Sequence, residues 1–180
     1  KNAGRCRDYR QNSCPRRRIT FPDRDMTALI RPATTSDVLS IHSLLQDYAE
    51  DGRLLERSSD EINERLRGFL VAEADGEVCG CGSLEIFTRE LGEVRSLAVH
   101  PSHHGQGLGQ QMVDGIEQMA RELGLTRMIA LTYVPGFFRK LGYQIVSMES
   151  LPEKVFGVCV ACPKFDHCDE IAMQKSLTDT

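Results

Sequence analysis

The spacing of apolar residues predicts a helix in the first third of the chain. Its apolar positions recur at intervals of three and four, as on one face of a helix. These positions are Val38, Ile41, Leu44, Leu45 and Tyr48. The polar run at 34–37 can cap the amino end, and Gly52 follows the last apolar position. A second, shorter helix is expected at 59–66.

Shorter apolar runs between turn residues predict strands. Asp75-Gly76 joins two of them, at 69–73 and 78–87, as a hairpin. Further strands are expected at 28–31, 93–99, 128–132 and 143–146, and further helices from the glycines at 105–109 to Leu123 and at 137–141. The order βααβββαβαβ predicts an α/β protein with a mixed sheet. No internal repeat or linker divides it.

A glycine-spaced loop lies between the strand at 93–99 and the next helix. Glycine lets the backbone approach an anion closely, and the first helical turn has N–H groups without a partner in the helix. Such a junction can bind phosphate. Gln110-Gln111 stands where a Walker loop has Lys-Ser/Thr, and the GxGxG spacing differs from the dinucleotide fingerprint GxGxxG. A turn that only caps the helix is the alternative.

The loop pattern also carries a family resemblance. His104-Gly105-Gln106-Gly107-Leu108-Gly109 resembles the Gln/Arg-x-x-Gly-x-Gly/Ala site for acetyl-CoA in the GNAT acyltransferase superfamily, with a histidine at the first position. The segments IRPATTSD, LLERS, EVRSLAV, LTYVPGFFRKLGY, LPEKV and CVACPKFDHCDEIAM narrow the resemblance to the short bacterial N-acetylglutamate synthases. The resemblance implies the GNAT fold, a central splayed sheet flanked by helices. It further implies one domain over 26–180, with a cysteine-containing segment at 151–173.

For function, the resemblance implies transfer of acetyl from acetyl-CoA to the α-amine of L-glutamate by direct attack, which opens arginine biosynthesis. Two alternatives stay open. One is the same chemistry on another amino acid or a protein amine. The other is a non-catalytic domain that binds acyl-CoA as a sensor or interaction module.

The resemblance places acetyl-CoA at the end of the strand and along the glycine loop. The expected contacts are Leu97, Ala98, Val99, His104, Gly105, Gln106, Gly107, Leu108, Gly109, Gln110 and Phe138. Backbone N–H groups at 97–99 would stabilise the oxyanion where the strand leaves its neighbour.

Acetyl transfer to an amine that is protonated at neutral pH needs a general base. Glu93, at the predicted strand start, is the expected base, and Glu85 is the alternative. Members of the superfamily often protonate the leaving thiolate with the tyrosine of a Phe-Tyr pair. Phe137-Phe138 stands at that place here, so Tyr133 is the nearest replacement.

An acceptor with two carboxylates needs cations. Arg57, within LLERS, corresponds to an arginine on the substrate side in the resembling synthases, and Arg95 and Lys154 are further candidates. Each could instead be an exposed surface charge. Arg95 shares a strand face with Glu93 and could pair with it.

Composition and charge narrow the class of protein. The chain has 180 residues, of which 41% are hydrophobic, and no apolar run long enough to cross a bilayer. Since 1–25 also lacks an export signal, a cytoplasmic protein is expected. That segment holds eight Lys or Arg against three Asp. It is expected to be a disordered or peripheral extension, and a nucleic-acid-binding arm is the less favoured alternative. A homodimer is left open.

Three of the seven cysteines lie close together near the carboxyl end. Cys159, Cys162 and Cys168 are candidate ligands of a structural zinc, whose fourth ligand would come from His167, from Cys79 or Cys81, or from a partner chain. Reduced thiols packed beneath the final strand are an equal alternative, followed by a redox pair or an iron–sulfur site. Cys79 and Cys81 themselves are expected in the core.

Overall fold

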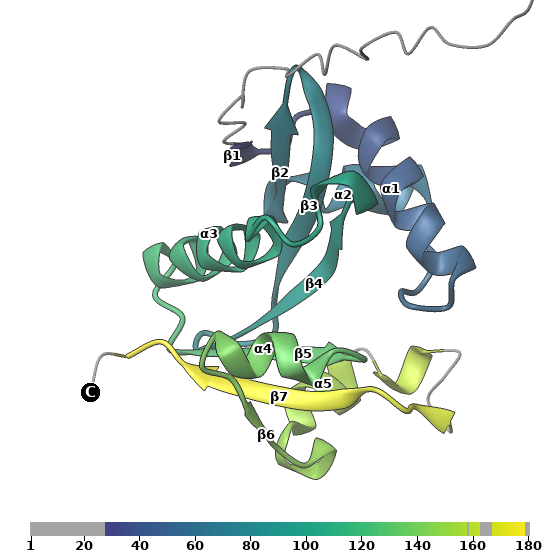
Figure 1. Cartoon of the computed structure of the whole chain (residues 1–180). Coiled ribbons are helices and arrows are strands. Elements are labelled where there is room, and N and C mark those ends of the chain that lie inside the picture. Colours follow the sequence, from purple (N-terminus) through teal and green to yellow (C-terminus); the bar gives the residue numbers. More distant parts are fainter. Residues whose placement is uncertain (1–27, 158, 163–166, 179–180) are drawn as a thin grey trace, which may run out of the picture.

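The computed structural model describes residues 28–157, 159–162 and 167–178 (Figure 1). Its strands are β1 (Leu29–Pro32), β2 (Phe69–Ala74), β3 (Glu77–Ile86), β4 (Leu91–Val99), β5 (Arg127–Thr132), β6 (Gln144–Ile145) and β7 (Ile171–Ser176). Its α-helices are α1 (Val38–Glu50), α2 (Ser59–Glu64), α3 (Leu108–Glu122), α4 (Pro135–Lys140) and α5 (Pro152–Gly157). The predicted extension at 1–25 lies outside the described residues. None of the described helices has the length and apolar character that a membrane span requires.

The strands form one mixed sheet in the order β1-β2-β3-β4-β5-β7-β6. Neighbours are antiparallel except for β4 and β5, which run parallel. In Figure 1, α3 covers one face of the β2–β4 half and α1 with α2 the other. The predicted α/β fold with a splayed mixed sheet is therefore confirmed.

The sheet opens between its two parallel strands. Only Leu91–Glu93 of β4 pairs with Arg127–Ile129 of β5, and beyond these residues the strands part (Figure 1). The register of β3 against β4 also shifts between Cys81 and Ser83, opposite Ser96, whose φ is +50°. A bulge of this kind bends a strand away from its neighbour. The bend and the short parallel ladder together create the opening in which the site lies.

Local sequence explains most of the helix and turn boundaries. The α1 residues Val38, Ile41, Leu44 and Leu45 are buried, as their spacing predicts. Ser58 and Glu61 form a reciprocal capping box that begins α2. The hairpin turn between β2 and β3 needs positive φ at two positions, which Asp75 and Gly76 adopt.

The buried residues form three clusters. The largest lies between α3 and the sheet and includes Met112, Val113 and Ile116. The second lies under α1 on the opposite face. The third joins Leu91 and Ile129 to Leu151 and Ala172, so the segments after 146 pack onto the same sheet.

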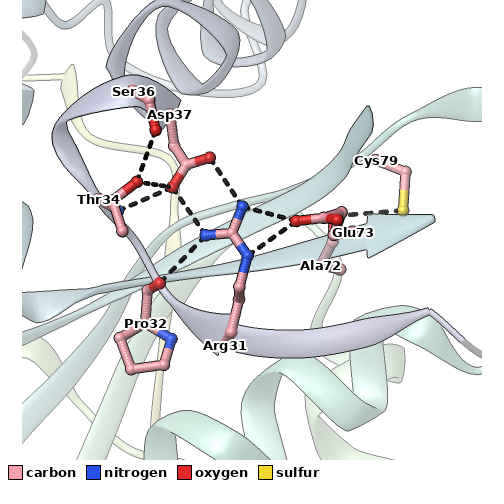
Figure 2. A network of polar contacts seen from close by, with 8 residues as sticks. All are labelled: Arg31, Pro32, Thr34, Ser36, Asp37, Ala72, Glu73 and Cys79. Carbon is pink, nitrogen blue, oxygen red and sulfur yellow. Dashed lines mark hydrogen bonds and ion pairs between the residues drawn. The ribbon is translucent and has the colours of Figure 1, made fainter. Parts of the chain in front are cut away.

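A charged network ties the first strand to the fold (Figure 2). Arg31 on β1 donates from Nε to Glu73 Oε2 at 2.8 Å, and from its terminal nitrogens to both Asp37 oxygens at 2.8 and 2.9 Å. The backbone N–H of Thr34 donates to Asp37 as well. The hydrogen bond from Arg31 is the main cause that lowers the pKa of Asp37. The bonds to Asp37 and Glu73 raise the pKa of Arg31 in turn.

Several predicted boundaries were wrong. The strand expected at 93–99 begins at Leu91, so Glu93 lies inside β4 rather than at its start. The strand expected at 143–146 is reduced to Gln144–Ile145. Two elements were not predicted: α5, and β7, which lies between β5 and β6. The final strand is therefore Ile171–Ser176.

Candidate active site

A cavity of about 1320 Å³ fills the opening between β4 and β5. Its wall includes residues of α1, the 53–57 segment, β4, the glycine loop, β5, α4 and the segment after α5. The predicted site residues on this wall are Arg57, Glu93, Arg95, Leu97, Val99, His104, Gly105, Gly107, Leu108, Gly109, Gln110, Tyr133, Phe138 and Lys154. Ala98 and Gln106 are not on it. Ala98 is buried beneath α1 instead. The alternative base Glu85 also lies outside, within 2.5 Å of Arg65.

The glycines of the loop differ in backbone conformation. Gly105 and Gly107 have φ of +75° and +77°, a backbone conformation that residues with a side chain rarely adopt. Gly107 is the N-cap residue of α3. Gly109 lies beside α4, where an added Cβ would be in ordinary van der Waals contact, 3.4 Å from the ring of Phe137. The loop therefore brings the amino end of a long helix to the cavity wall, where an anion is favoured.

Two side chains fasten the end of β4 beside this loop. His104 Nε2 donates to the Val99 carbonyl at 2.7 Å, and the Tyr48 hydroxyl donates to the same oxygen at 2.7 Å. The Val99 N–H lies 3.4 Å from the Tyr48 hydroxyl, and Arg53 stacks over the Tyr48 ring at 4.4 Å. The spacing of apolar residues predicts Tyr48 only as part of the buried face of α1. Periodicity does not predict that its hydroxyl, at the last turn of α1, contacts the end of β4 and His104.

At the other end of the cavity, two residues predicted for different roles form an ion pair. Lys154 Nζ donates to Glu93 Oε2 at 2.7 Å, and the side chains are only 5% and 2% exposed. Arg95 Nε approaches the same oxygen at 3.4 Å. The expected base is thus buried between two cations. Lys154 and Arg95, both predicted to bind the acceptor, line the cavity and contact Glu93, and for Arg95 this pairing is the alternative that the shared strand face predicts.

Arg57 differs from these cations. Its Nε donates to Ser96 Oγ at 3.2 Å, and among the described residues it forms no salt bridge. Burial is the main cause that lowers the pKa of Arg57, and the charge of Arg95 adds to it. A partly buried guanidinium on a cavity wall without a carboxylate partner favours the binding of an anionic ligand.

The proposed acid and its aromatic neighbours lie on the β5 side. The Tyr133 hydroxyl donates to Asp169 Oδ1 at 2.8 Å. Phe138 is buried and stacks edge to face on Phe137 and Tyr143, with centroids 5.0 and 5.2 Å away. Phe138 therefore shapes the wall and supplies no proton.

The tail cysteines reach the same cavity. Cys159, Cys162 and Cys168 line it, and the five described cysteines are free thiols. No group of three or more His, Cys, Asp or Glu suited to a metal occurs within the described part of the chain, and 163–166 fall outside that part. Cys79 and Cys81 are buried in the core as predicted.

A mixed sheet that parts between two parallel strands, with a glycine loop and a helix amino end at the opening, is the architecture of an acyl-CoA-dependent N-acyltransferase. The sequence profile of the acetyltransferase (GNAT) family matches residues 38–143. The chain belongs to this family and is a GNAT acetyltransferase.

Relatives and solved structures agree with this assignment. The chain is 38% identical over 148 residues to an uncharacterized N-acetyltransferase of Chlorobaculum tepidum, covering 82% of this chain and 96% of the relative. It is 38% identical over 142 residues to an amino-acid acetyltransferase of Mycobacterium tuberculosis, covering 77% and 80%. It spans only 30% of the amino-acid acetyltransferase of Aeromonas salmonicida.

Among solved structures, the N-acetylglutamate synthase of Neisseria gonorrhoeae in complex with coenzyme A and N-acetyl-glutamate superposes with a TM-score of 0.78 at 28% identity. The superposition covers 85% of this chain and 36% of the synthase. A Mycobacterium tuberculosis protein in complex with CoA matches with a TM-score of 0.72 at 32% identity, over 83% and 99% of the two chains.

Proposed function

We propose that this GNAT acetyltransferase is an amino-acid N-acetyltransferase that acetylates the α-amine of L-glutamate. The observation that carries the proposal is Arg57, a partly buried cation that forms no salt bridge within the described part of the chain, on the wall of the cavity that also holds Glu93 and the glycine loop. The named relatives support the amino-acid class, and the synthase complex with N-acetyl-glutamate supports this acceptor.

In the proposed reaction, the glycine loop and the amino end of α3 bind the pyrophosphate of acetyl-CoA. The α-amine of glutamate attacks the thioester carbonyl while Arg57 binds a carboxylate of the acceptor through paired hydrogen bonds. Glu93 accepts the amine proton, directly or through water. The C–N bond forms, the C–S bond breaks, and the CoA thiolate leaves with a proton from Tyr133 or solvent.

The ion pair decides which oxygen of Glu93 can accept the proton in this mechanism. Lys154 and Arg95 both approach Oε2, so in the proposal Oε1 is the oxygen that takes the proton. Lys154 and Arg95 act as positioning residues that hold the carboxylate at the cavity wall. In this proposal they act on the acceptor through Glu93, whereas the sequence predicts them as direct acceptor contacts.

The wider setting follows from the same proposal. The product would enter arginine biosynthesis, and the enzyme would act in the cytoplasm. A structural zinc at the tail cysteines and a homodimer stay predictions.

Assay of a panel of amino acids tests the acceptor. Release of CoA thiol is followed with each amino acid and with a peptide amine at one concentration. We expect glutamate to give the highest kcat/KM, with glutamine at least about tenfold lower, because a buried cation left without its carboxylate loses a charged hydrogen bond worth about 1.5–3 kcal/mol. A preference for an apolar amino acid or for the peptide would refute the proposed acceptor. No turnover with any amine would favour an acyl-CoA-binding module.

A further inference from the structure

The tail cysteines are not used by the proposed acetyl transfer, yet two of them form a compact pair. Cys159–Ala161 is a turn of 3₁₀-helix, and the Cys162 N–H donates to the Cys159 carbonyl at 2.9 Å. Residues i and i+3 of such a turn lie one above the other, about 6 Å apart at a rise of about 2.0 Å per residue. Disulfides join Cα atoms that are about 4.4–6.8 Å apart. The turn therefore already holds both cysteines at disulfide spacing.

Cys159 and Cys162 lie at the end of the cavity where the acceptor is proposed to bind. Both cysteines and Cys168 line the cavity together with Glu93 and Lys154. Lys154 belongs to α5, the helix that directly precedes the turn. A change in the turn can therefore reach the Lys154–Glu93 ion pair through one short helix.

The remaining described cysteines offer an internal comparison. Cys79 and Cys81 are only 4% and 0% exposed, and burial raises the pKa of Cys81 to about 12. Burial also raises the pKa of Cys159, although the charge of Lys154 opposes this. Cys159 and Cys162 are half-buried and line the cavity.

We propose that Cys159 and Cys162 form a redox-active dithiol in the wall of the catalytic cavity, whose oxidation by a small disulfide slows acetyl transfer. One cysteine thiolate attacks the small disulfide and releases one small thiol. The second cysteine then attacks the resulting mixed disulfide and releases the other small thiol. Two protein thiols lose two electrons and two protons, and one small disulfide gains them.

The effect on turnover comes from the geometry that the disulfide imposes on the turn. The bond fixes the two sulfur atoms about 2.05 Å apart and the Cβ–S–S–Cβ dihedral at about ±85–100°, so the two side chains and the turn that carries them lose the freedom of the reduced thiols. Misplacement of a positioning group by about 1 Å can cost up to about 10²-fold in rate. Because α5 carries Lys154 into contact with Glu93, we expect kcat to fall by about tenfold. The KM for acetyl-CoA should stay unchanged, because the glycine loop lies at the other end of the cavity.

The test uses the intact, reduced protein incubated with oxidised glutathione. Intact mass spectrometry before alkylation should show a loss of about 2 Da, alkylation should label two thiols fewer, and the peptide map should contain a Cys159–Cys162 disulfide. Dithiothreitol should restore both thiols and kcat. Cys162→Ser should abolish the disulfide and leave a glutathione adduct on Cys159, whereas the double variant Cys159→Ser/Cys162→Ser should make activity insensitive to oxidised glutathione. The matched variant Cys168→Ser should still form the Cys159–Cys162 disulfide and still lose activity on oxidation.

Several outcomes would overturn the proposal. In the wild type they are a glutathione adduct that persists, a disulfide that requires Cys168, a bound metal that protects the pair from alkylation, or a Cys159–Cys162 disulfide that leaves kcat unchanged. The effect on turnover rests on the proposed function, but the disulfide does not. If the reduced protein fails to acetylate glutamate, the proposed acceptor is wrong, while the mass measurement still decides the existence of the dithiol.

Discussion

Substitution of Lys154 by methionine tests the buried ion pair that organises the acceptor end of the cavity. Methionine keeps much of the apolar stem and removes the charge 2.7 Å from Glu93 Oε2. At an effective dielectric constant of about 20, the gross attraction at that distance is about 6 kcal/mol. Breaking a buried pair by removing one partner costs about 3–5 kcal/mol of net stability. Arg95 remains 3.4 Å from the same oxygen, so we expect a loss near the lower limit, about 3 kcal/mol.

Urea unfolding at neutral pH measures this loss, and thermal unfolding should show a decrease in Tm of roughly 6–12 °C for a chain of this length. The double variant Lys154→Met/Glu93→Gln should recover most of the stability, because no unpaired charge remains buried. Lys140→Met, at an exposed lysine on the same cavity wall, should change stability by less than about 0.5 kcal/mol. A loss below about 1 kcal/mol for Lys154→Met, or no recovery in the double variant, would refute the reasoning.

Three further predictions address the cofactor loop, the acceptor site and the amino-terminal network. Gly107→Glu should abolish binding of acetyl-CoA in calorimetry, because it places a carboxylate beside the expected pyrophosphate. Gly124→Glu, which introduces similar backbone strain at the other end of α3, should leave the affinity intact, and equal losses in both variants would contradict the loop assignment. Arg57→Lys should raise KM for glutamate by about tenfold through loss of the bidentate contact, and an unchanged preference for glutamate over glutamine would count against this site. Asp37→Asn should destabilise the protein by about 1–3 kcal/mol at pH 7. Because Arg31 lowers the pKa of Asp37, this difference should be complete above the unfolded pKa near 3.9 and should shrink as pH falls below it. A difference that is constant from pH 7 to pH 2.5 would show that the charge of Asp37 does not matter.

Features encoded within a few residues were readable from the sequence. The glycine loop, the 75–76 hairpin and the apolar face of α1 each depend on a short pattern, and the structure places all three as predicted. The cavity also collects most of the predicted site residues, because they follow from the order of motifs along the chain.

Features that depend on distant contacts were not readable. Glu93 and Lys154 are 61 positions apart, and no local pattern shows that a predicted base and a predicted substrate ligand neutralise one another. The strand β7 follows a cysteine-rich segment, and its insertion between β5 and β6 is a matter of sheet topology. The short apolar run Ile171-Ala172-Met173 between polar residues was the available signal for it. Tyr48 carried two roles, of which periodicity indicates only the buried one.

The most direct test of the central claim follows the reaction product itself. Purified protein is incubated with acetyl-CoA labelled in the acetyl group and with L-glutamate, and labelled N-acetylglutamate is quantified against released CoA for the wild type and Glu93→Gln. We predict one labelled product per CoA released by the wild type, and a kcat lower by about 10²–10⁴-fold in the folded variant. Release of CoA without labelled N-acetylglutamate, or a Glu93→Gln rate within about threefold of the wild type, would contradict the account.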